Sequence, residues 1–223
     1  MEWQPILLTL QLALVSTVLL LLICVPLAWW LASTQSRAKP VVETLVSLPL
    51  VLPPTVLGFY LLVAFSPNNA VGQWLGAWLG IRLVFSFPGL VLGSIIYSLP
   101  FMVQPIHSGL AGLPSSLREA SYVLGKSRWA TLVTVLLPNI RPSLLTGIVL
   151  AFAHTLGEFG VVLMIGGSIP GRTRVASIAI YEQVEANNLA LANTYALVLF
   201  ALAFVLLLTV YLLNGGYLKR FGR

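Results

Sequence analysis

Five long apolar segments, separated by short polar stretches, set the pattern of this chain. Each is at least as long as the run of about 20 apolar residues that a helix needs to cross a bilayer. The pattern predicts an all-α integral membrane protein with about five transmembrane helices in one domain, residues 1–223. The predicted spans are 6–31, 43–65, 84–110, 143–165 and 189–213.

The longest polar-rich interruption, Ser115–Pro138, predicts a first short amphipathic helix. This helix is expected to begin near Leu117, with Ser115 and Ser116 as caps and Glu119 in its first turn. Its apolar face is expected to consist of Leu117, Ala120, Val123 and Leu124, opposite Arg118 and Glu119.

A second helix is expected to follow a sharp break at Gly125, which has no Cβ to oppose a left-handed turn. The second helix runs from about Ser127 and is expected to end at Pro138. Its apolar side consists of Trp129, Leu132, Val133, Leu136 and Leu137. Two helices at an angle between membrane spans predict either a rigid knob that a protein outside the bilayer grips or an interfacial re-entrant loop without a partner.

Composition supports a membrane location, because only 8% of the residues are charged and 58% are hydrophobic. Soluble domains have about 25% charged residues. We expect no separate nucleotide-binding domain, since the chain has no GxxxxGK[ST] phosphate loop. Cys24 stands alone, and we find no hydrolase triad, paired carboxylates or metal-binding cluster, so we expect neither a catalytic nor a metal site.

The net charge of +6 is spread between apolar spans, so we expect no nucleic-acid partner. Cytoplasmic loops of membrane proteins are enriched in Lys and Arg. This rule predicts an external N-terminus and a cytoplasmic C-terminus and knob. The residues on the predicted cytoplasmic side are Arg37, Lys39, Arg118, Lys126, Arg128, Arg141, Lys219, Arg220 and Arg223, and those on the other side are Arg82, Arg172 and Arg174.

Prolines interrupt two of the predicted spans. The second contains Pro49, Pro53, Pro54 and then Thr55, and the third contains Pro88, Pro100 and Pro105. Carbonyl groups freed by proline at membrane depth are tolerated only where protein or a water-filled cavity satisfies them. The segment 53–55 is therefore either a packing kink or part of a translocation path.

The fourth span carries two ionisable residues, His154 and Glu158, at a spacing that places them on one helix face and allows them to pair. Intramembrane ionisable groups are expensive to bury and are candidates for function. One interpretation is that they line the path or its gate. The other is that Glu158 ties its helix to a neighbour through hydrogen bonds.

Short elements are expected between the spans. Residues 73–78 predict a small interfacial helix with Trp74 and Trp78 at the headgroup boundary, and residues 176–184 predict another short helix. The loop 166–173 is expected to be a turn on which Arg172 and Arg174 meet acidic residues of an external partner.

The knob also resembles a known motif. Glu119-Ala120-Ser121, Gly125, Val135 and Leu137-Pro138 match the spacing of the EAA loop of ABC-importer permeases, with Ser121 and Val135 in place of Ala and Ile. The segments LPLVLPPTVLG, around Pro53, and Thr155–Gly160 resemble segments of molybdate permeases. The second also resembles sulfate permeases, which have Ser at the position of Thr155.

The resemblance implies a type I ABC-importer permease in a bacterial or archaeal cell (inner) membrane. It further implies a homodimer with two cytoplasmic ATPase subunits, which bind ATP and magnesium, and a periplasmic or lipid-anchored oxyanion-binding protein. The permease itself would bind no cofactor. Coupling to the ATPase would involve Arg118, Glu119, Ala120, Ser121, Gly125, Leu137 and Pro138.

The substrate is expected to be molybdate, with sulfate, thiosulfate or tungstate as alternatives. A second class of function is an ion-coupled secondary transporter that uses His154 and Glu158 as a proton relay. A third is a scaffold subunit of an intramembrane enzyme, against which the lack of a ligand cluster argues.

Overall fold

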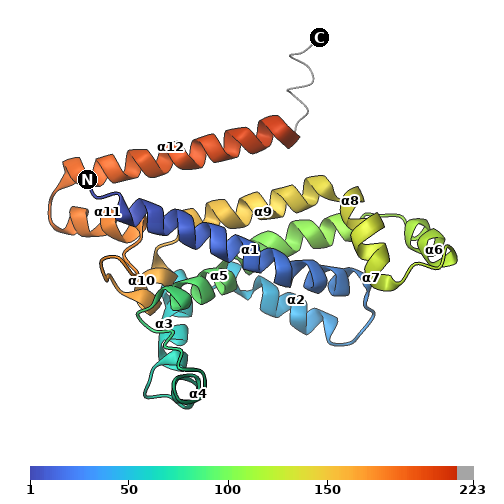
Figure 1. Cartoon of the computed structure of the whole chain (residues 1–223), viewed down its shortest axis with the longest axis horizontal. Coiled ribbons are helices and arrows are strands. Elements are labelled where there is room, and N and C mark those ends of the chain that lie inside the picture. The colour runs from blue at the N-terminus through green and yellow to red at the C-terminus, as the bar shows by residue number, and fades with distance from the viewer. Residues whose placement is uncertain (215–223) are drawn as a thin grey trace, which may run out of the picture.

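The computed structural model describes residues 1–214, and these contain helices and no strand. The prediction of an all-α protein is confirmed. The predicted basic tail residues Lys219, Arg220 and Arg223 lie outside the described residues. Figure 1 shows the helices as an elongated bundle with most long axes nearly parallel.

The bundle is built around α5 (Phe87–Ala111), which packs against both α1 (Gln4–Ser33) and α9 (Arg141–Leu156). The last helix, α12 (Leu189–Asn214), lies against α9 and α11 (Figure 1). In the described part of the chain, α1, α5 and residues 189–209 of α12 are single helices long and apolar enough to cross a membrane.

The predicted interruption of the third span is wrong. Helix α5 runs unbroken through Pro100 and Pro105, and Pro88 sits in its first turn, where its missing N–H removes no helical hydrogen bond. Each interior proline removes one backbone hydrogen bond. Packing of α1 and α9 along α5 keeps the helix continuous despite this loss.

The predicted interruption of the second span is confirmed, and the fourth span, expected to be continuous, is also broken. The second consists of α2 (Lys39–Ser47), the short η1 (Leu48–Leu50) and α3 (Pro54–Phe65), bent by 111°. In the fourth, α9 stops at Leu156 and α10 (Gly160–Gly166) begins after a break. A bend of 83° also separates residues 128–139 from α9, and counting each bent pair as one span gives up to five spans.

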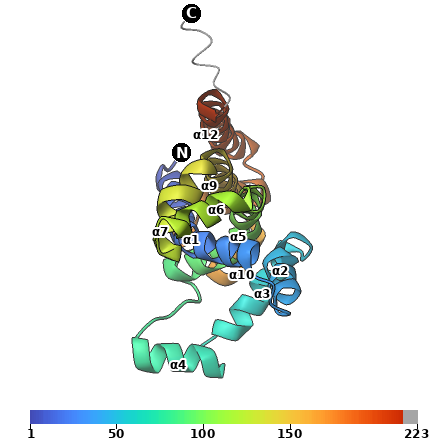
Figure 2. The ribbon, with the colours of Figure 1, turned by 90° about the vertical axis from the view of Figure 1, so that its right-hand side faces the viewer.

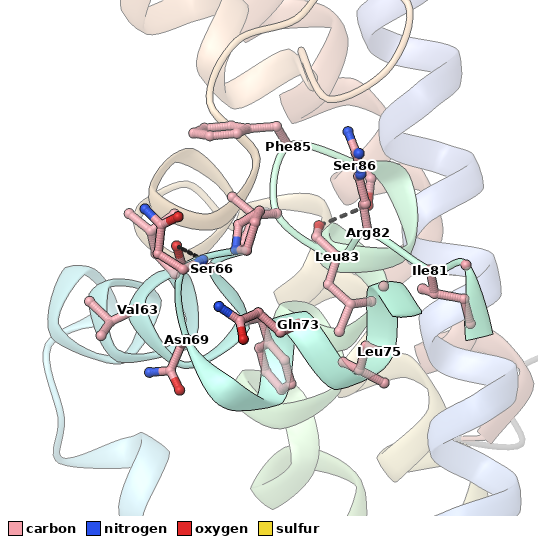
Figure 3. A pocket seen from close by; sticks show the side chains of 18 of the residues that line it. Val63, Ser66, Asn69, Gln73, Leu75, Ile81, Arg82, Leu83, Phe85 and Ser86 are labelled. Atoms are coloured by element: carbon pink, nitrogen blue, oxygen red, sulfur yellow. Dashed lines mark hydrogen bonds between the residues drawn. The ribbon is translucent and has the colours of Figure 1, made fainter. Parts of the chain in front are cut away.

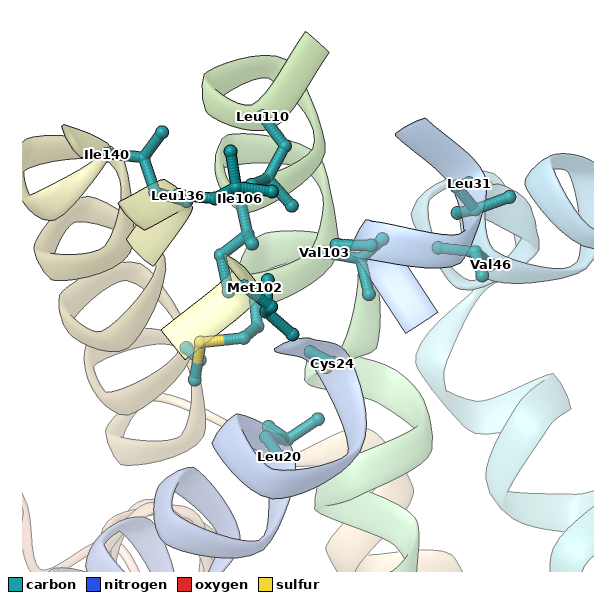
Figure 4. Packing of buried hydrophobic residues seen from close by; sticks show 13 residues of the cluster. Leu20, Cys24, Leu31, Val46, Met102, Val103, Ile106, Leu110, Leu136 and Ile140 are labelled. Carbon is teal, nitrogen blue, oxygen red and sulfur yellow. The ribbon is translucent and has the colours of Figure 1, made fainter. Parts of the chain in front are cut away.

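Two apolar clusters fill the bundle at its opposite ends. One contains Cys24 of α1, Met102 and Ile106 of α5, and Leu136, which lie close together in Figure 4. The other contains Leu12, Leu90 and Ile165. Helix α5 contributes to both clusters and therefore connects the two ends.

Two short helices lie outside this core. Helix α4 (Ala70–Leu79) stands away from the body at the end of α3 (Figure 2), with Trp74 and Trp78 exposed. Helix α11 (Ala176–Glu185) packs on α12 and contacts α1. Both predicted short helices are therefore confirmed, while an interfacial position for α4 stays a prediction.

The two ends of the bundle carry different elements. The connection between α1 and α2 lies at the same end as α6 and α7, whereas the N-terminus, α10 and α11 lie at the other (Figure 1). Helix α12 runs from the α11 end towards the α6 end. The α1–α2 loop with Arg37 and helix α6 with Arg118 are thus at the opposite end from the α10–α11 loop, which carries Arg172.

Candidate coupling and gating sites

The stretch Ser115–Pro138, called the protrusion below, extends from one end of the bundle (Figure 1). It contains α6 (Ser115–Val123), α7 (Arg128–Thr131), the π-helix η2 (Leu132–Leu136) and the start of α8 (Leu137–Asn139). The two-helix prediction is confirmed. The predicted caps are wrong, because α6 begins at Ser115 directly after the extended Pro114, and Glu119 falls beyond its first turn.

The turn between the two helices depends on Gly125, whose φ is +76°. The N–H of Gly125 donates to the Tyr122 carbonyl (2.9 Å), and that of Lys126 donates to the Ser121 carbonyl (3.1 Å). This pair of hydrogen bonds is a Schellman motif. A Cβ on Gly125 would meet nothing within 4 Å, so the position requires glycine for its backbone conformation alone.

Side chains fix α6 against the second helix. The hydroxyls of Ser121 and Thr131 are 2.9 Å apart and buried, and Lys126 Nζ donates to Thr134 Oγ1 at 2.8 Å. Ser127 accepts from the Ala130 N–H as the N-cap of α7. Ser121 is the residue at which the sequence departs from the EAA pattern, and sequence reasoning missed its role as a tie.

The second helix anchors the protrusion in the core. Leu132 and Leu136 are buried in the cluster that contains Ile106, and the Trp129 ring lies 5.8 Å from that of Trp29. Figure 4 shows Leu136 beside Ile106. Val133, expected on the apolar side, is half exposed.

The tip of α6 is apolar and uncovered by the described chain. Val123 is 87% exposed and Leu124 is 78% exposed, with Tyr122 beside them at 43%. Glu119 and Ala120 are also exposed, whereas Arg118 is half-buried. The protrusion therefore presents an apolar tip bordered by a carboxylate.

Pro138 does not end the helix, contrary to the prediction. It lies exposed inside α8, and the chain turns only at Ile140, while Leu137 is half-buried. The π-helical turn before Pro138 changes the hydrogen-bond register, so a residue without an N–H is accommodated there.

At the other end, the interruptions of the second and fourth spans meet. We call the residues 51–53 and 157–159 the double break. A Cβ on Gly160 would lie 2.7 Å from Pro54 Cβ and 3.2 Å from the Thr55 nitrogen. Pro53, Pro54 and Thr55 therefore lie against the segment that follows Glu158, and both Pro53 and Thr55 are exposed.

His154 belongs to α9 and is held by α5. Its Nδ1 lies 2.9 Å from Ser98 Oγ, and its ring stacks on Phe101 at a centroid distance of 4.0 Å. The Ser98 hydroxyl also lies 3.1 Å from Thr155 Oγ1. His154 thus belongs to a polar cluster between α5 and α9.

Glu158 lies inside the break and does not pair with His154. The helix ends at Leu156, so the i, i+4 geometry on which the predicted pair depended is lost. The carboxylate is 5% exposed, and neither oxygen has a hydrogen-bond partner within residues 1–214. The side chain also makes no tie to a neighbouring helix there; instead, the Glu158 backbone carbonyl accepts from Ser177 Oγ at 2.5 Å.

Arg174 forms ion pairs within the chain. Its Nε lies 2.7 Å from Glu182 Oε2, and its Nη1 lies 3.1 Å from Glu2 Oε2. Ser168 donates to the other oxygen of Glu182. Two carboxylates of this chain therefore pair with Arg174, and a contact of Arg172 and Arg174 with an external partner stays a prediction.

Comparison with known proteins identifies the family. The model of the binding-protein-dependent transport system inner membrane component matches residues 24–220. The chain belongs to this family of transport permeases. The molybdenum transport system permease protein of Azotobacter vinelandii is 48% identical over 205 residues, which cover 92% of this chain and 90% of the relative. The corresponding protein of Escherichia coli K12 is 37% identical over 184 residues, 82% of this chain and 80% of the relative.

The fold agrees with this assignment. A bacterial ABC transporter for the import of the acidic polysaccharide alginate contains a chain that superposes with a TM-score of 0.78. The match covers 95% of this permease and 78% of that chain at 19% sequence identity. The predicted type I importer permease fold is therefore confirmed, as is an integral membrane transport subunit.

The permease has an open hollow at the end opposite the protrusion. It has a volume of about 1260 Å³ and lies between the end of α3, α4 and residues 80–86. Figure 3 shows Gln73, Arg82 and Ser86 around it, and Arg172, which is exposed, also lines it. The hollow thus brings together two of the three arginines of this end.

No three His, Cys, Asp or Glu side chains within residues 1–214 gather closely enough to hold a metal ion. The arrangement presents an exposed apolar helix tip at one end of the permease and a break in two spans at the other. Sequence reasoning missed Ser98 and Ser177. A hydroxyl in an apolar helix was the available signal, but many such hydroxyls bond only to their own helix, as Thr194 does to the Ala190 carbonyl.

Proposed function

We propose that this chain is the membrane-spanning half of a homodimeric, ATP-driven importer of molybdate. Relatives named as molybdenum transport permeases support the substrate, and the matched length supports assignment of the whole chain. The partners are two cytoplasmic ATPase subunits, which bind ATP and magnesium, and a periplasmic or lipid-anchored binding protein. This subunit hydrolyses nothing and needs no cofactor of its own.

The observation that carries the proposal is the protrusion. Its α6 tip exposes Val123 and Leu124 to the surroundings, while Leu132 and Leu136 anchor its second half in the core. An apolar helix tip on a stiff support fits a groove on a partner protein. The basic residues at this end support an orientation of the protrusion towards the cytoplasm, where ATP is available, with the N-terminus outside.

Closure of the two ATPase subunits draws the two protrusions of the dimer together. Because the second helix of each protrusion packs on α5, the motion passes into the bundle as a rigid-body switch between inward-open and outward-open arrangements. At the far end, the double break, with Pro53, Pro54, Thr55 and Glu158, forms the gate next to His154. The hollow lined by Arg82 and Arg172 receives the oxyanion from the binding protein.

The experiment uses the complete complex, reconstituted in vesicles, with Glu119→Lys or Gly125→Pro in the protrusion. Both variants are expected to lose co-purification of the ATPase and ATP-coupled uptake. Glu43→Lys is the control, because Glu43 is a half-exposed helical carboxylate at this end, and its salt bridge within residues 1–214 is with Lys39. Unchanged uptake and unchanged ATPase co-purification in both protrusion variants would exclude the coupling role.

Two further measurements test the proposed substrate and the proposed energy source. Competition among molybdate, tungstate, sulfate and thiosulfate for the binding protein identifies the oxyanion, and preferred binding of sulfate would overturn the substrate assignment. Uptake with ATP and a protonophore tests the energy source. Uptake that collapses with the proton gradient while ATP persists would indicate a secondary transporter.

A further inference from the structure

Helix α11 contacts the fourth-span break at two points one helical turn apart. Ser177 Oγ donates to the Glu158 carbonyl, and the Tyr181 ring lies 5.1 Å from the Phe159 ring. Residues four apart lie on the same helix face, so a single face of α11 holds two consecutive residues of the break.

The hydrogen bond compensates for the broken helix. Residues 157–159 leave the helical path between α9 and α10, so the Glu158 carbonyl has no helical N–H to accept from. A carbonyl without a partner at membrane depth is costly, and an interior break persists only where a neighbour satisfies it. Ser177 supplies that partner.

The C-terminal half of α11 is held by an ion pair and a hydrogen bond at Glu182. Glu182, the residue after Tyr181, accepts from Arg174 and Ser168, and Arg174 also binds Glu2 at the N-terminus. These residues lie at the end away from the protrusion, where the N-terminus and α11 are found (Figure 1). Helix α11 therefore joins an ion-pair cluster at this end to the backbone of the break.

We infer that Ser177 and Tyr181 are positioning residues that hold the fourth-span break in the conformation described here, with α11 as the link between that break and the end of the permease that carries the N-terminus. The effect on transport rests on the proposed importer function. The effect on the conformation of the break does not, because it follows from contacts within this chain.

The test measures the break directly in the purified complex without substrate. A cysteine in place of Val161, which is fully buried two residues after the break, reports opening through its reaction rate with a membrane-impermeant maleimide, while the native Cys24 is itself buried. Ser177→Ala is expected to raise the labelling rate by about tenfold, because the break loses one partly buried hydrogen bond. Ser177→Thr keeps the hydroxyl and is expected to restore the slow rate.

A second pair of variants keeps the test decisive if Ser177→Ala fails to fold. Tyr181→Leu removes the ring contact and is expected to raise labelling about fivefold, whereas Tyr181→Phe retains the ring and the slow rate. Ser33→Ala is the matched control, because the Ser33 hydroxyl bonds only within its own helix at the other end.

Equal labelling rates in Ser177→Ala, Tyr181→Leu and the parent would overturn the inference. In vesicles, uptake per ATP hydrolysed is expected to fall in Ser177→Ala and to recover in Ser177→Thr. If the parent complex itself imports no oxyanion while the labelling differences persist, the proposed function fails and the positioning role stands.

Discussion

The hydroxyls of Ser121 and Thr131 lie 2.9 Å apart, and both side chains are almost fully buried. One comes from the first helix of the protrusion and the other from the second. They form the only side-chain hydrogen bond between α6 and α7 in the described chain. This pair of hydroxyls therefore fixes α6, which carries the exposed apolar tip, relative to the second helix of the protrusion, which is buried in the core.

Replacement of Ser121 by Ala is expected to destabilise the protrusion although Ala fits the family pattern. The Thr131 hydroxyl would remain buried without its partner, at a cost of about 1–3 kcal/mol. Thermal unfolding of the complex and co-purification of the ATPase measure the effect. The double variant with Thr131→Val removes both polar groups and should recover most of the loss, and equal stability of Ser121→Ala and the parent would contradict the role of this pair.

Gly125→Ala is expected to cost about 1–2 kcal/mol, since a left-handed backbone is unfavourable for any residue with a Cβ. Space is not the obstacle at this position, because an added Cβ meets no atom within 4 Å. ATPase affinity and uptake should both fall. Gly76→Ala is the control, because Gly76 lies in α4 with equal free space and has no positive φ. A similar loss in both variants would show that the left-handed backbone of Gly125 is not the cause.

Gly160→Ala is expected to force the two broken spans apart, because its Cβ would lie 2.7 Å from Pro54 Cβ. Overpacking of this kind costs about 1–3 kcal/mol. Uptake should fall while ATPase co-purification, which depends on the opposite end, remains. The control is Gly157→Ala, whose Cβ would come no closer than 3.9 Å to its neighbours. Normal uptake in Gly160→Ala would show that the close approach is not needed.

Arg174→Gln is expected to lower the melting temperature by removing the pairs with Glu182 and Glu2. The ion pairs are partly exposed, so the free energy of unfolding should fall by about 1 kcal/mol, and by less at 1 M salt. Arg172→Gln provides the control, because Arg172 is exposed in the same loop and forms no salt bridge within residues 1–214. Equal melting temperatures for Arg174→Gln and the parent would show that the network contributes no stability.

Local chemistry predicted much of the fold. The apolar runs located α1, α5 and α12, and Gly125 and Ser127 located the turn and the start of the second helix in the protrusion. These features depend on residues close together in the sequence, for which periodicity and capping rules hold.

Contacts between distant segments explain the failures. Pro100 and Pro105 suggested an interruption, yet packing on both sides keeps α5 continuous. His154 and Glu158 suggested a pair, yet the chain leaves the helix between them, and each is bound by a residue from another helix. Neither Ser98 nor Ser177 carries a sequence mark that separates it from a hydroxyl bonded to its own helix.

The continuity of α5 has a consequence for how the permease responds to load. A continuous helix is stiff along its axis, so under the proposed function a displacement at one end of α5 is carried to its other end. Ile106 meets the anchored half of the protrusion, and Ser98, about two turns away, touches His154. We therefore expect α5 to carry such a displacement along its length, and bending to occur mainly where the second and fourth spans are broken.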